Sequence, residues 1–375
     1  MGAEQTVIAP GRVNLLGEHV DYNAGPVLPA AIDRAVRLKF SPRAGTQMHL
    51  VALDLKAETR FDLDSLGRKK DIYGRPLPAW ALYPAGVAWA LQQHGLEVRG
   101  LEGIYTSDVP IGAGLSSSAA VEVAFACAWQ ALGGWKIDPM CLAQDCQQAE
   151  VQYVGLNSGL MDQFASVHGV AGHALYFDTR SLAWKPIPLP AGTALVIADS
   201  GVRRSLAGSA YNERHAACEQ AVTLLRQALP AIQALRDVSP AQLTAYAQLL
   251  PEVVYKRARH VVEECERVDQ AVVLLEQGQA QAFGRLMFAG HASLRDLYEV
   301  SCPELDRLVE IAGSLPGCLG ARLTGAGFGG CTVNLVEEGQ ALSFVEELKE
   351  VYAQKTGRMS QVYLCKASQG AHIVD

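Results

Sequence analysis

The sequence predicts an α+β fold that is divided between two domains. Its 375 residues, of which 49% are hydrophobic, can bury more apolar surface than one core usually holds. Strand-like and helical segments also follow one another irregularly, without the strict strand–helix repeat of α/β proteins. The stretch 209–315 is mostly helical, and a boundary near residues 190–200 is expected to separate domains 1–194 and 195–375, each with a mixed sheet and helices.

The individual elements follow from local patterns along the chain. Strands are expected at 4–10, 27–40, 193–198, 320–324, 331–336 and 360–366, and a hairpin at 171–189. Helices are expected at 209–228, 252–277, 279–291, 303–314 and 338–356. A further helix begins at Asp138-Pro139, because Asp is a favourable N-cap and Pro is tolerated at the first helical position. Ser301 and Glu304 predict a capping box before the helix at 303.

The composition argues against several classes of function. With 32 basic and 39 acidic residues the net charge is −7, and no basic patch indicates binding to nucleic acid or to a membrane surface. The uncharged stretch 76–96 contains prolines and polar residues, so it is not a membrane span. The nine cysteines include no CxxC pair, which favours reduced thiols over a zinc site or a disulfide framework. The first ten residues lack a signal-peptide pattern, and a cytoplasmic protein is expected.

Two glycine-rich segments are candidates for contact with phosphate. In Pro110–Ala120, Gly112 and Gly114 allow a tight turn, and three serines at 116–118 precede a helical run whose free N–H groups bind anions. This segment is not a Walker A loop, because it lacks the GxxxxGK[ST] pattern. Leu323–Cys331 holds four glycines between two strands and is expected to pack against the phosphates or against the first loop. Taken alone, each segment is equally compatible with an ordinary turn.

The segment Gly11–Asn23 gathers polar side chains that suit the binding of a sugar, including Arg12, Glu18, His19 and Asp21. An aldohexose carries many hydroxyl groups, and one carboxylate can accept hydrogen bonds from two of them. A solvated loop is the alternative interpretation of this segment alone.

Two further carboxylates are candidates for phosphoryl-transfer chemistry. That reaction needs in-line positioning, a cation on the developing charge and a group that orients the acceptor hydroxyl. Asp162 opens a short helical run, where the helix N-terminus and a neighbouring Arg would keep it ionised. Glu150 lies one helix earlier and is a candidate metal ligand, although a solvated helix face is the simpler interpretation.

Together these segments resemble the galactokinases of the GHMP kinase family. Ala9–Asn23, with its GEHVDYN run, is similar to the galactokinase hallmark, and the two glycine-rich segments are similar to the phosphate motif and the third motif of the family. Gly159–Gln163 lies where the family keeps its catalytic aspartate. The resemblance extends from residue 7 to about residue 366, and it implies a two-domain GHMP-kinase-like fold with the active site in the cleft between the domains.

The resemblance also implies roles for individual residues. Asp162 would accept or polarise the proton of the sugar hydroxyl, and Arg12 would stabilise that carboxylate and the transferring phosphoryl group. The residues expected to hold the sugar are Glu18, His19, Asp21, Gly159 and Tyr211. Those expected to hold the phosphates are Gly112, Ala113, Gly114, Leu115, Ser116, Ser117 and Ser118. Mg²⁺ would be held by Ser118 and Glu150, and the adenine would lie near Trp80 and Tyr83.

Three positions depart from the pattern of the family. Val20 stands where Thr is usual, so a hydroxyl is lost beside the sugar loop. Leu82 stands where Asn is common, next to the residues expected at the adenine. Ala326 replaces a usual Gly, which is tolerable only if this backbone position does not need a positive φ angle.

The expected function is therefore ATP- and Mg²⁺-dependent transfer of the γ-phosphoryl group to the C1 hydroxyl of galactose, by direct in-line displacement in a monomeric enzyme. Two alternatives stay open, which are a kinase for a related sugar (N-acetylgalactosamine, arabinose or galacturonate) and a non-catalytic sugar and ATP sensor. Such sensors lose the Ser-Ala pair that stands here at 118–119, which argues against the second alternative. The GEHVDYN run argues against homoserine and mevalonate as acceptors.

Overall fold

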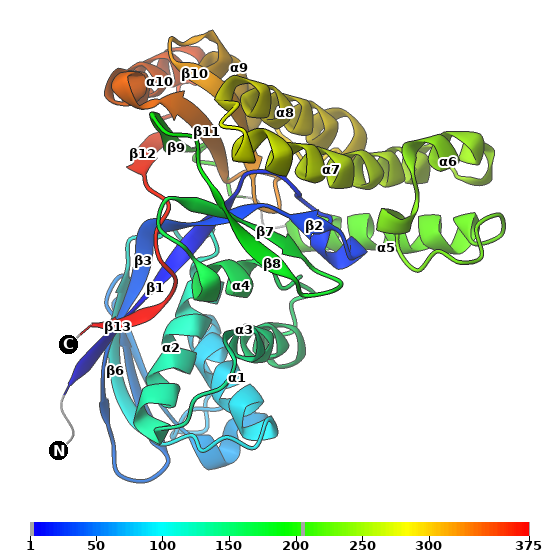
Figure 1. The fold of residues 1–375 in the computed structure, drawn as a ribbon. Coiled ribbons are helices and arrows are strands. Elements are labelled where there is room, and N and C mark those ends of the chain that lie inside the picture. The colour runs from blue at the N-terminus through cyan, green and yellow to red at the C-terminus, as the bar shows by residue number, and fades with distance from the viewer. Residues whose placement is uncertain (1–3, 204–206, 375) are drawn as a thin grey trace.

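The computed structural model describes residues 4–203 and 207–374. Within these residues the chain forms three β-sheets and ten α-helices (Figure 1). This mixture of sheets and helices confirms the predicted α+β fold class. Residues 1–3, at the start of the segment interpreted as lacking a signal peptide, lie outside the described part of the chain.

The first sheet has six strands in the order β13-β1-β3-β6-β4-β5. They are β1 Gln5–Asn14, β3 Pro29–Pro42, β4 Gln47–Ala52, β5 Ala57–Asp62, β6 Leu101–Ser107 and β13 His372–Val374. β4 and β6 run parallel, and the other neighbours are antiparallel. The helices α1 Ala79–Gln93, α2 Ser117–Gly133 and α3 Pro139–Gln148 cover one face of this sheet, and their apolar side chains form one core with it (Figure 1).

The second sheet lies in the upper part of Figure 1 and has the order β10-β11-β9-β12. Its strands are all antiparallel to their neighbours, and they are β9 Thr193–Asp199, β10 Cys318–Thr324, β11 Cys331–Glu337 and β12 Gln361–Cys365. The helices α9 Pro303–Ser314 and α10 Ala341–Thr356 share an apolar core with it. A third, small sheet has the order β2-β7-β8, with β2 Pro26–Val27, β7 His173–Asp178 and β8 Trp184–Pro188.

Of the remaining helices, α5, α6 and α7 extend to the right-hand side of Figure 1, while α4 lies near its middle. They are α4 Met161–His168, α5 Ala207–Leu225, α6 Pro240–Ala245, α7 Glu252–Glu276 and α8 Ala280–Ser293. The long helix α7 is amphipathic, since buried residues recur along it every three or four positions. These residues are Val254, Ala258, Val261, Cys265, Val268, Val272 and Leu275. This face packs into two cores, one with α4 and α5 and one with β1, α8 and β11.

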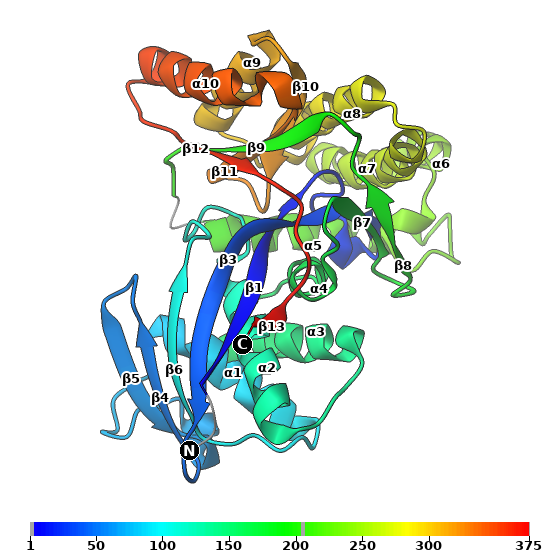
Figure 2. The ribbon, with the colours of Figure 1, turned by 60° about the vertical axis from the view of Figure 1, so that its left-hand side comes forward.

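The predicted domain boundary between residues 194 and 195 falls inside β9. After β12 the chain also returns to the first sheet, where β13 pairs with β1 and Val374 lies opposite Thr6 (Figure 2). A division into two domains therefore has to assign β13 to the first domain, although it follows residue 195 in the sequence.

Most predicted strands and helices are present within a few residues of their expected ends. The predicted capping box is wrong, because α9 begins at Pro303 with Cys302 as its N-cap, and Ser301 donates its hydroxyl to Asp306 at 2.5 Å. Proline favours the first helical position, which moves the cap one residue past Ser301.

The uncharged stretch 76–96 contains α1, which was not predicted and which has Pro84 inside it. Across residues 4–203 and 207–374, no helix has both the length and the apolar character that crossing a membrane requires.

Candidate active site

A cavity of about 390 Å³ lies where loops from both halves of the chain meet. Its walls come from the segment after β1, the loop before α2, the loop before α4, the start of α5 and the glycine-rich loop after β10. Most predicted site residues line it, namely Arg12, Glu18, His19, Asp21, Gly112, Gly114, Leu115, Ser116, Ser117, Ser118, Glu150, Gly159, Asp162 and Tyr211. The fold therefore gathers residues that are distant in the sequence around one space.

Three predicted residues do not line this cavity. The segment Gly112–Ser118 is called the phosphate loop below. Within it, Ala113 is fully buried in the core. Trp80 and Tyr83 lie near the start of α1, where Trp80 packs against Tyr105 with ring centroids 6.1 Å apart. Leu82, the departure from the family pattern in this region, packs with Trp80 against the core of the first sheet.

Arg12 and Asp162 form an ion pair in the cavity wall. Nε and Nη2 of Arg12 donate to Oδ1 of Asp162 at 2.9 and 2.8 Å, and Nη1 donates to the carbonyl of Gly114 at 2.6 Å. The other carboxylate oxygen of Asp162 accepts from the hydroxyl of Ser116 at 2.5 Å. The Asp162 side chain is 29% exposed while that of Arg12 is 5% exposed. The carboxylate is thus fixed in orientation and still accessible from the cavity.

The phosphate loop has an unusual backbone. Gly112 and Gly114 adopt positive φ angles, and so does Ser116, at 60°, a conformation that non-glycine residues rarely adopt. α2 begins directly afterwards at Ser117, so its free N–H groups face the loop. The hydroxyl of Ser116 is already used by Asp162, which leaves the hydroxyls of Ser117 and Ser118 for other partners.

The glycine-rich loop after β10 packs directly on the phosphate loop, as the sequence predicts. A Cβ atom on Gly325 would lie 2.6 Å from the carbonyl oxygen of Gly114, and one on Gly330 would lie 2.8 Å from that of Ala113. Two backbones can approach this closely only where side chains are missing. Ala326 is not among the residues with positive φ, which explains why alanine is tolerated there.

Glu18 and Asp21 are held on one side of the cavity. Glu18 accepts the backbone N–H of Gly325 at 2.7 Å, and burial raises its pKa to about 7, although Arg322 and Arg12 oppose this shift. Burial and the neighbouring Asp162 raise the pKa of Asp21 to about 6. A Cβ atom on Gly159 would lie 1.7 Å from Oδ2 of Asp21. Only glycine at position 159 therefore leaves room for this carboxylate.

His19 and Tyr211 lie on the same side, with ring centroids 5.5 Å apart. His19 has a left-handed backbone with a φ angle of 62°. Val20, by contrast, is fully buried in the core around α5 and α7 and does not line the cavity. The hydroxyl that Val20 lacks would therefore lie in that core rather than in the cavity.

A buried ion network behind Glu18 was not predicted from the sequence. Glu264 on α7 accepts the backbone N–H of Gly17 at 2.9 Å and pairs with Arg322 at 2.8 Å and with Arg267 at 2.6 Å. Burial alone would raise the pKa of Glu264, but Arg322 and Arg267 outweigh it and hold the pKa well below its usual range. Arg322 also donates to the carbonyl of Leu15 at 3.2 Å. The sequence offered one sign of this network, which is that the charged residue Glu264 lies on the buried face of α7.

Glu150 lies on the opposite side, in a π-helical turn at Ala149–Val154 that continues α3. It is 5% exposed, so the simpler interpretation as a solvated helix face is wrong. Its Oε2 accepts from the hydroxyl of Ser158 at 2.5 Å and from Nε2 of Gln163 at 3.0 Å. Burial raises the pKa of Glu150.

Gln163 also joins Glu150 to a second carboxyl group that was not predicted. Its Nε2 donates to Oε2 of Glu122 at 2.9 Å, and both side chains are fully buried. Burial and the charge of Glu150 raise the pKa of Glu122 well above its usual value. Oε1 of Glu122 and Oε1 of Gln163 have no hydrogen-bond partner among the described residues.

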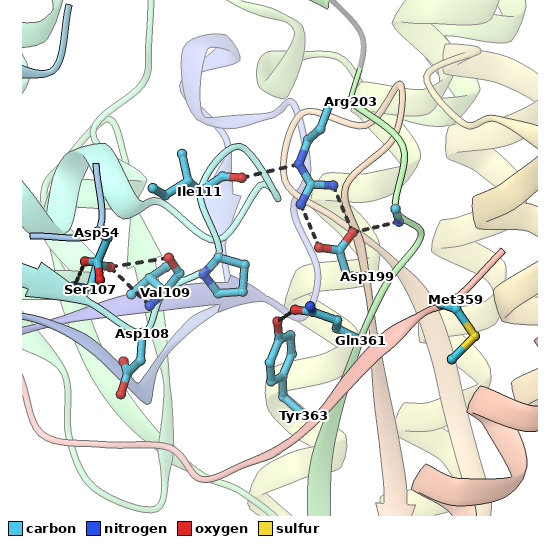
Figure 3. A pocket seen from close by; sticks show the side chains of 12 residues that line it. Asp54, Ser107, Asp108, Val109, Ile111, Asp199, Arg203, Met359, Gln361 and Tyr363 are labelled. Carbon is cyan, nitrogen blue, oxygen red and sulfur yellow. Dashed lines mark hydrogen bonds and ion pairs between the residues drawn. The ribbon is translucent and has the colours of Figure 1, made fainter. Parts of the chain in front are cut away.

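A second cavity, of about 420 Å³, lies beside the start of the phosphate loop (Figure 3). Arg203 crosses it, with a two-point ion pair to Asp199 at 2.8 and 2.6 Å and a hydrogen bond from Nε to the carbonyl of Ile111 at 3.3 Å. Asp54 accepts from Thr106 and from the backbone of Ser107. Because these charges and polar groups satisfy one another, this cavity ties the phosphate loop to the end of β9.

Comparison with known proteins agrees with this geometry. Residues 1–42 match the galactokinase galactose-binding signature, residues 83–170 the GHMP kinase N-terminal domain and residues 271–354 the GHMP kinase C-terminal domain. A galactokinase of Roseiflexus sp. (strain RS-1) is 48% identical over 364 residues, which are 97% of this chain and 91% of that protein. A galactokinase of Chloroflexus aurantiacus is 46% identical over 98% of this chain and 92% of its own length.

Solved structures give the same result at the level of the fold. The crystal structure of Lactococcus lactis galactokinase complexed with galactose superposes with a TM-score of 0.92 at 34% identity, covering 98% of this chain and 95% of that one. The mevalonate kinase of Methanococcus jannaschii superposes with a TM-score of 0.70 at 18% identity, covering 98% of this chain and 99% of its own. The second similarity shows the shared fold alone.

Proposed function

The chain belongs to the galactokinases of the GHMP kinase family, and we propose that it transfers the γ-phosphoryl group of ATP to the C1 hydroxyl of galactose, giving galactose 1-phosphate and ADP. ATP-dependent phosphorylation of galactose is the activity of that family and of this chain. The choice of the C1 hydroxyl rests on the resemblance to the galactokinases. The observation that carries the proposed phosphoryl transfer is that the Arg12–Asp162 pair lines one cavity together with the carboxylates of Glu18 and Asp21 and the phosphate loop.

Asp162 and Arg12 are proposed as the catalytic residues. A hydroxyl group of the sugar donates to the exposed part of the Asp162 carboxylate, which accepts or polarises its proton as the oxygen attacks the γ-phosphorus atom in line with the departing ADP. Arg12 holds Asp162 in place through two N–H groups and adds positive charge beside the transferring group. No phosphoenzyme is required, because the acceptor and the phosphoryl group occupy the same cavity.

The sugar is proposed to lie against Glu18, His19, Asp21, Gly159 and Tyr211. Glu18 and Asp21 are buried carboxyl groups at fixed positions, and such groups accept hydrogen bonds from neighbouring sugar hydroxyls. Gly159 leaves the space that Asp21 occupies. Tyr211 would close the sugar against His19.

The phosphates are proposed to lie against the loop from Gly112 to Ser118 and the N-terminus of α2, whose N–H groups favour anions. Ser118 and Glu150 suit Mg²⁺, because this ion takes few protein ligands, prefers oxygen and completes its shell with phosphates and water. When bound there, Mg²⁺ would supply positive charge that offsets the negative charge of the phosphates. A role of Trp80 and Tyr83 at the adenine rests on the family resemblance, since neither side chain lines the cavity.

The cysteines bear on the cellular setting. All nine cysteines are free, which fits the reducing conditions of the cytoplasm. We propose a cytoplasmic enzyme that acts as a monomer, because all the residues assigned to catalysis and substrate binding come from one chain.

Replacing the proposed catalytic pair tests this function. Asp162→Ala and Arg12→Ala should each lower kcat by at least ~10²-fold, because proton acceptance or charge stabilisation is lost. The exposed Asp64→Ala is the matched control and should keep wild-type kcat. A coupled assay of ADP release should give galactose the highest kcat/KM among galactose, N-acetylgalactosamine, arabinose and galacturonate. Near-normal kcat in both variants would contradict the roles, and preference for another sugar would contradict the acceptor.

A further inference from the structure

Both ring nitrogens of His19 are engaged inside the protein. Nε2 lies 3.1 Å from the carbonyl oxygen of Ala326, and Nδ1 lies 2.9 Å from the hydroxyl of Tyr22. The carbonyl oxygen of His19 accepts from Nδ2 of Asn23 at 3.0 Å. The His19 side chain thus keeps no free nitrogen for the sugar, although it lines the sugar side of the cavity.

These contacts continue as a chain of hydroxyl and thiol groups. The hydroxyl of Tyr22 lies 2.7 Å from that of Tyr298, which lies 3.3 Å from Sγ of Cys218. Tyr298 and Cys218 are buried and do not line the cavity. Four residues from three separate segments are therefore linked behind the sugar loop.

The chemistry of the groups sets the direction of every bond in this chain. A carbonyl oxygen can only accept, so Nε2 of His19 carries the proton, and in a neutral ring Nδ1 must accept from Tyr22. Tyr22 has then used its single proton and must accept from Tyr298. Tyr298 has likewise used its proton, so the thiol of Cys218 donates to it. The bonds run from Cys218 through both tyrosines to His19 and end at Ala326.

His19 is neutral because its surroundings oppose a positive charge. Burial, the adjacent His260 and the guanidinium groups of Arg214 and Arg322 lower its pKa to about 3, although the Ala326 carbonyl opposes the shift. His260 packs against Tyr298 with ring centroids 4.5 Å apart and donates from Nε2 to the carbonyl of Glu18 at 3.1 Å. The backbone carbonyl that precedes His19 is therefore held by the same buried cluster that contains Tyr298.

We propose that Tyr22, Tyr298 and Cys218 are positioning residues for sugar recognition, which lock His19 in its Nε2–H tautomer and so fix the loop that carries Glu18 and Asp21. This inference rests on the proposed function. The left-handed backbone of His19 is unfavourable for a residue with a side chain, and anchoring its ring at both ends stabilises that conformation. If these hydrogen bonds are lost, the loop that carries Glu18 and Asp21 relaxes, and both carboxylates move away from their proposed sugar-binding positions.

The variant Tyr298→Phe tests the proposal, because it removes one hydroxyl without changing the shape of the core. It should raise the KM for galactose about tenfold, while kcat and the KM for ATP stay within about twofold of wild type. The matched control is Tyr352→Phe, which removes a buried hydroxyl that donates to the carbonyl of Ser200 at 2.9 Å, far from this chain. It should lower thermal stability to a similar degree and leave the galactose KM unchanged. Equal galactose KM values in the two variants would overturn the proposal.

The tautomer provides a readout that does not depend on activity. In protein labelled with ¹⁵N-histidine, long-range ¹H–¹⁵N spectra should show His19 with a protonated Nε2 and an unprotonated Nδ1, assigned by loss of the signals in His19→Gln. Tyr22→Phe should shift the Nδ1 resonance, and Tyr352→Phe should not. A protonated Nδ1 in the wild type would overturn the proposed direction of the hydrogen bonds from Cys218 to His19. Absence of galactose-dependent ADP release in the wild type would instead remove the proposed function, while the spectra would still decide the hydrogen-bond chain.

Discussion

The sugar side and the phosphate side of the cavity are built differently. On the sugar side Glu18 is bonded to Gly325, both nitrogens of His19 are used, and Glu264 is paired with arginines behind them, where Nη2 of Arg322 and Nη2 of Arg267 have no hydrogen-bond partner among the described residues. On the phosphate side, Glu150 and Glu122 share the amide of Gln163, and one carboxyl oxygen of Glu122 and the amide oxygen of Gln163 are left without a partner among the described residues. Arg12 is the one arginine or lysine among the described residues that line the cavity.

This difference corresponds to the chemistry of the two substrates. A neutral sugar is recognised by hydrogen-bond groups held at fixed positions, and rigid pairing within the protein provides them. Phosphates carry the charge that must be balanced, and oxygen ligands for a divalent cation are better suited to that task than a preformed set of ion pairs. Substitutions on the sugar side should therefore change the KM for galactose, and those on the phosphate side should change the requirement for Mg²⁺.

The largest effect is expected on the sugar side, at Gly159. In Gly159→Ala the new Cβ atom would lie 1.7 Å from Oδ2 of Asp21, so the carboxylate must move. We expect kcat/KM for galactose to fall by ~10²-fold, as for an ångström-scale misplacement of a binding group. The KM for ATP should stay unchanged. Gly339→Ala is the control, because no atom lies near its added Cβ. An unchanged galactose KM in Gly159→Ala would show that the position of the Asp21 carboxylate does not determine the binding of galactose.

A smaller effect is expected on the phosphate side, at Gln163. Gln163→Leu removes the amide that orients Glu150, and loss of such an outer-shell partner lowers metal affinity by ~10-fold or more. The Mg²⁺ concentration that half-saturates ADP binding, measured by calorimetry, should rise accordingly, with the galactose KM unchanged at saturating Mg²⁺. The more exposed Gln148→Leu is the control. A change in the galactose KM alone would show that the two sides are not separable.

The smallest effect is expected from pH. Glu18 and Asp21 have pKa values raised to about 7 and about 6, so both become protonated as the pH falls through this range and accept fewer hydrogen bonds. Steady-state kinetics should show kcat/KM for galactose falling by roughly tenfold between pH 8 and pH 6. Glu18→Gln should remove the upper part of this dependence. A flat profile in the wild type would show that neither carboxylate must be ionised to bind the sugar.

Most residues that the sequence proposes for the site line one cavity, whereas several residues packed behind them were not predicted. The hallmark segment, the phosphate loop and Asp162 lie in short local motifs, and the structure gathers them around one cavity. The capping box at Ser301 failed because Pro303 imposed the helix start by its own geometry. Trp80 and Tyr83 do not line the cavity, and Trp80 packs against the core of the first sheet instead.

The sequence by itself determined the fold class, from the order of strands and helices along the chain, and the family, from short motifs, which also supplied the residues proposed to face the substrates. Only the tertiary structure decided which residues stand behind them. Glu264 and Arg322 support the sugar loop, Glu122 and Gln163 support Glu150, and Tyr298 and Cys218 support His19. These partners are buried polar groups, which need a hydrogen-bond partner wherever the fold brings one into reach. No local pattern encodes that choice, since the partners of the sugar loop lie some 200 to 300 residues away along the chain.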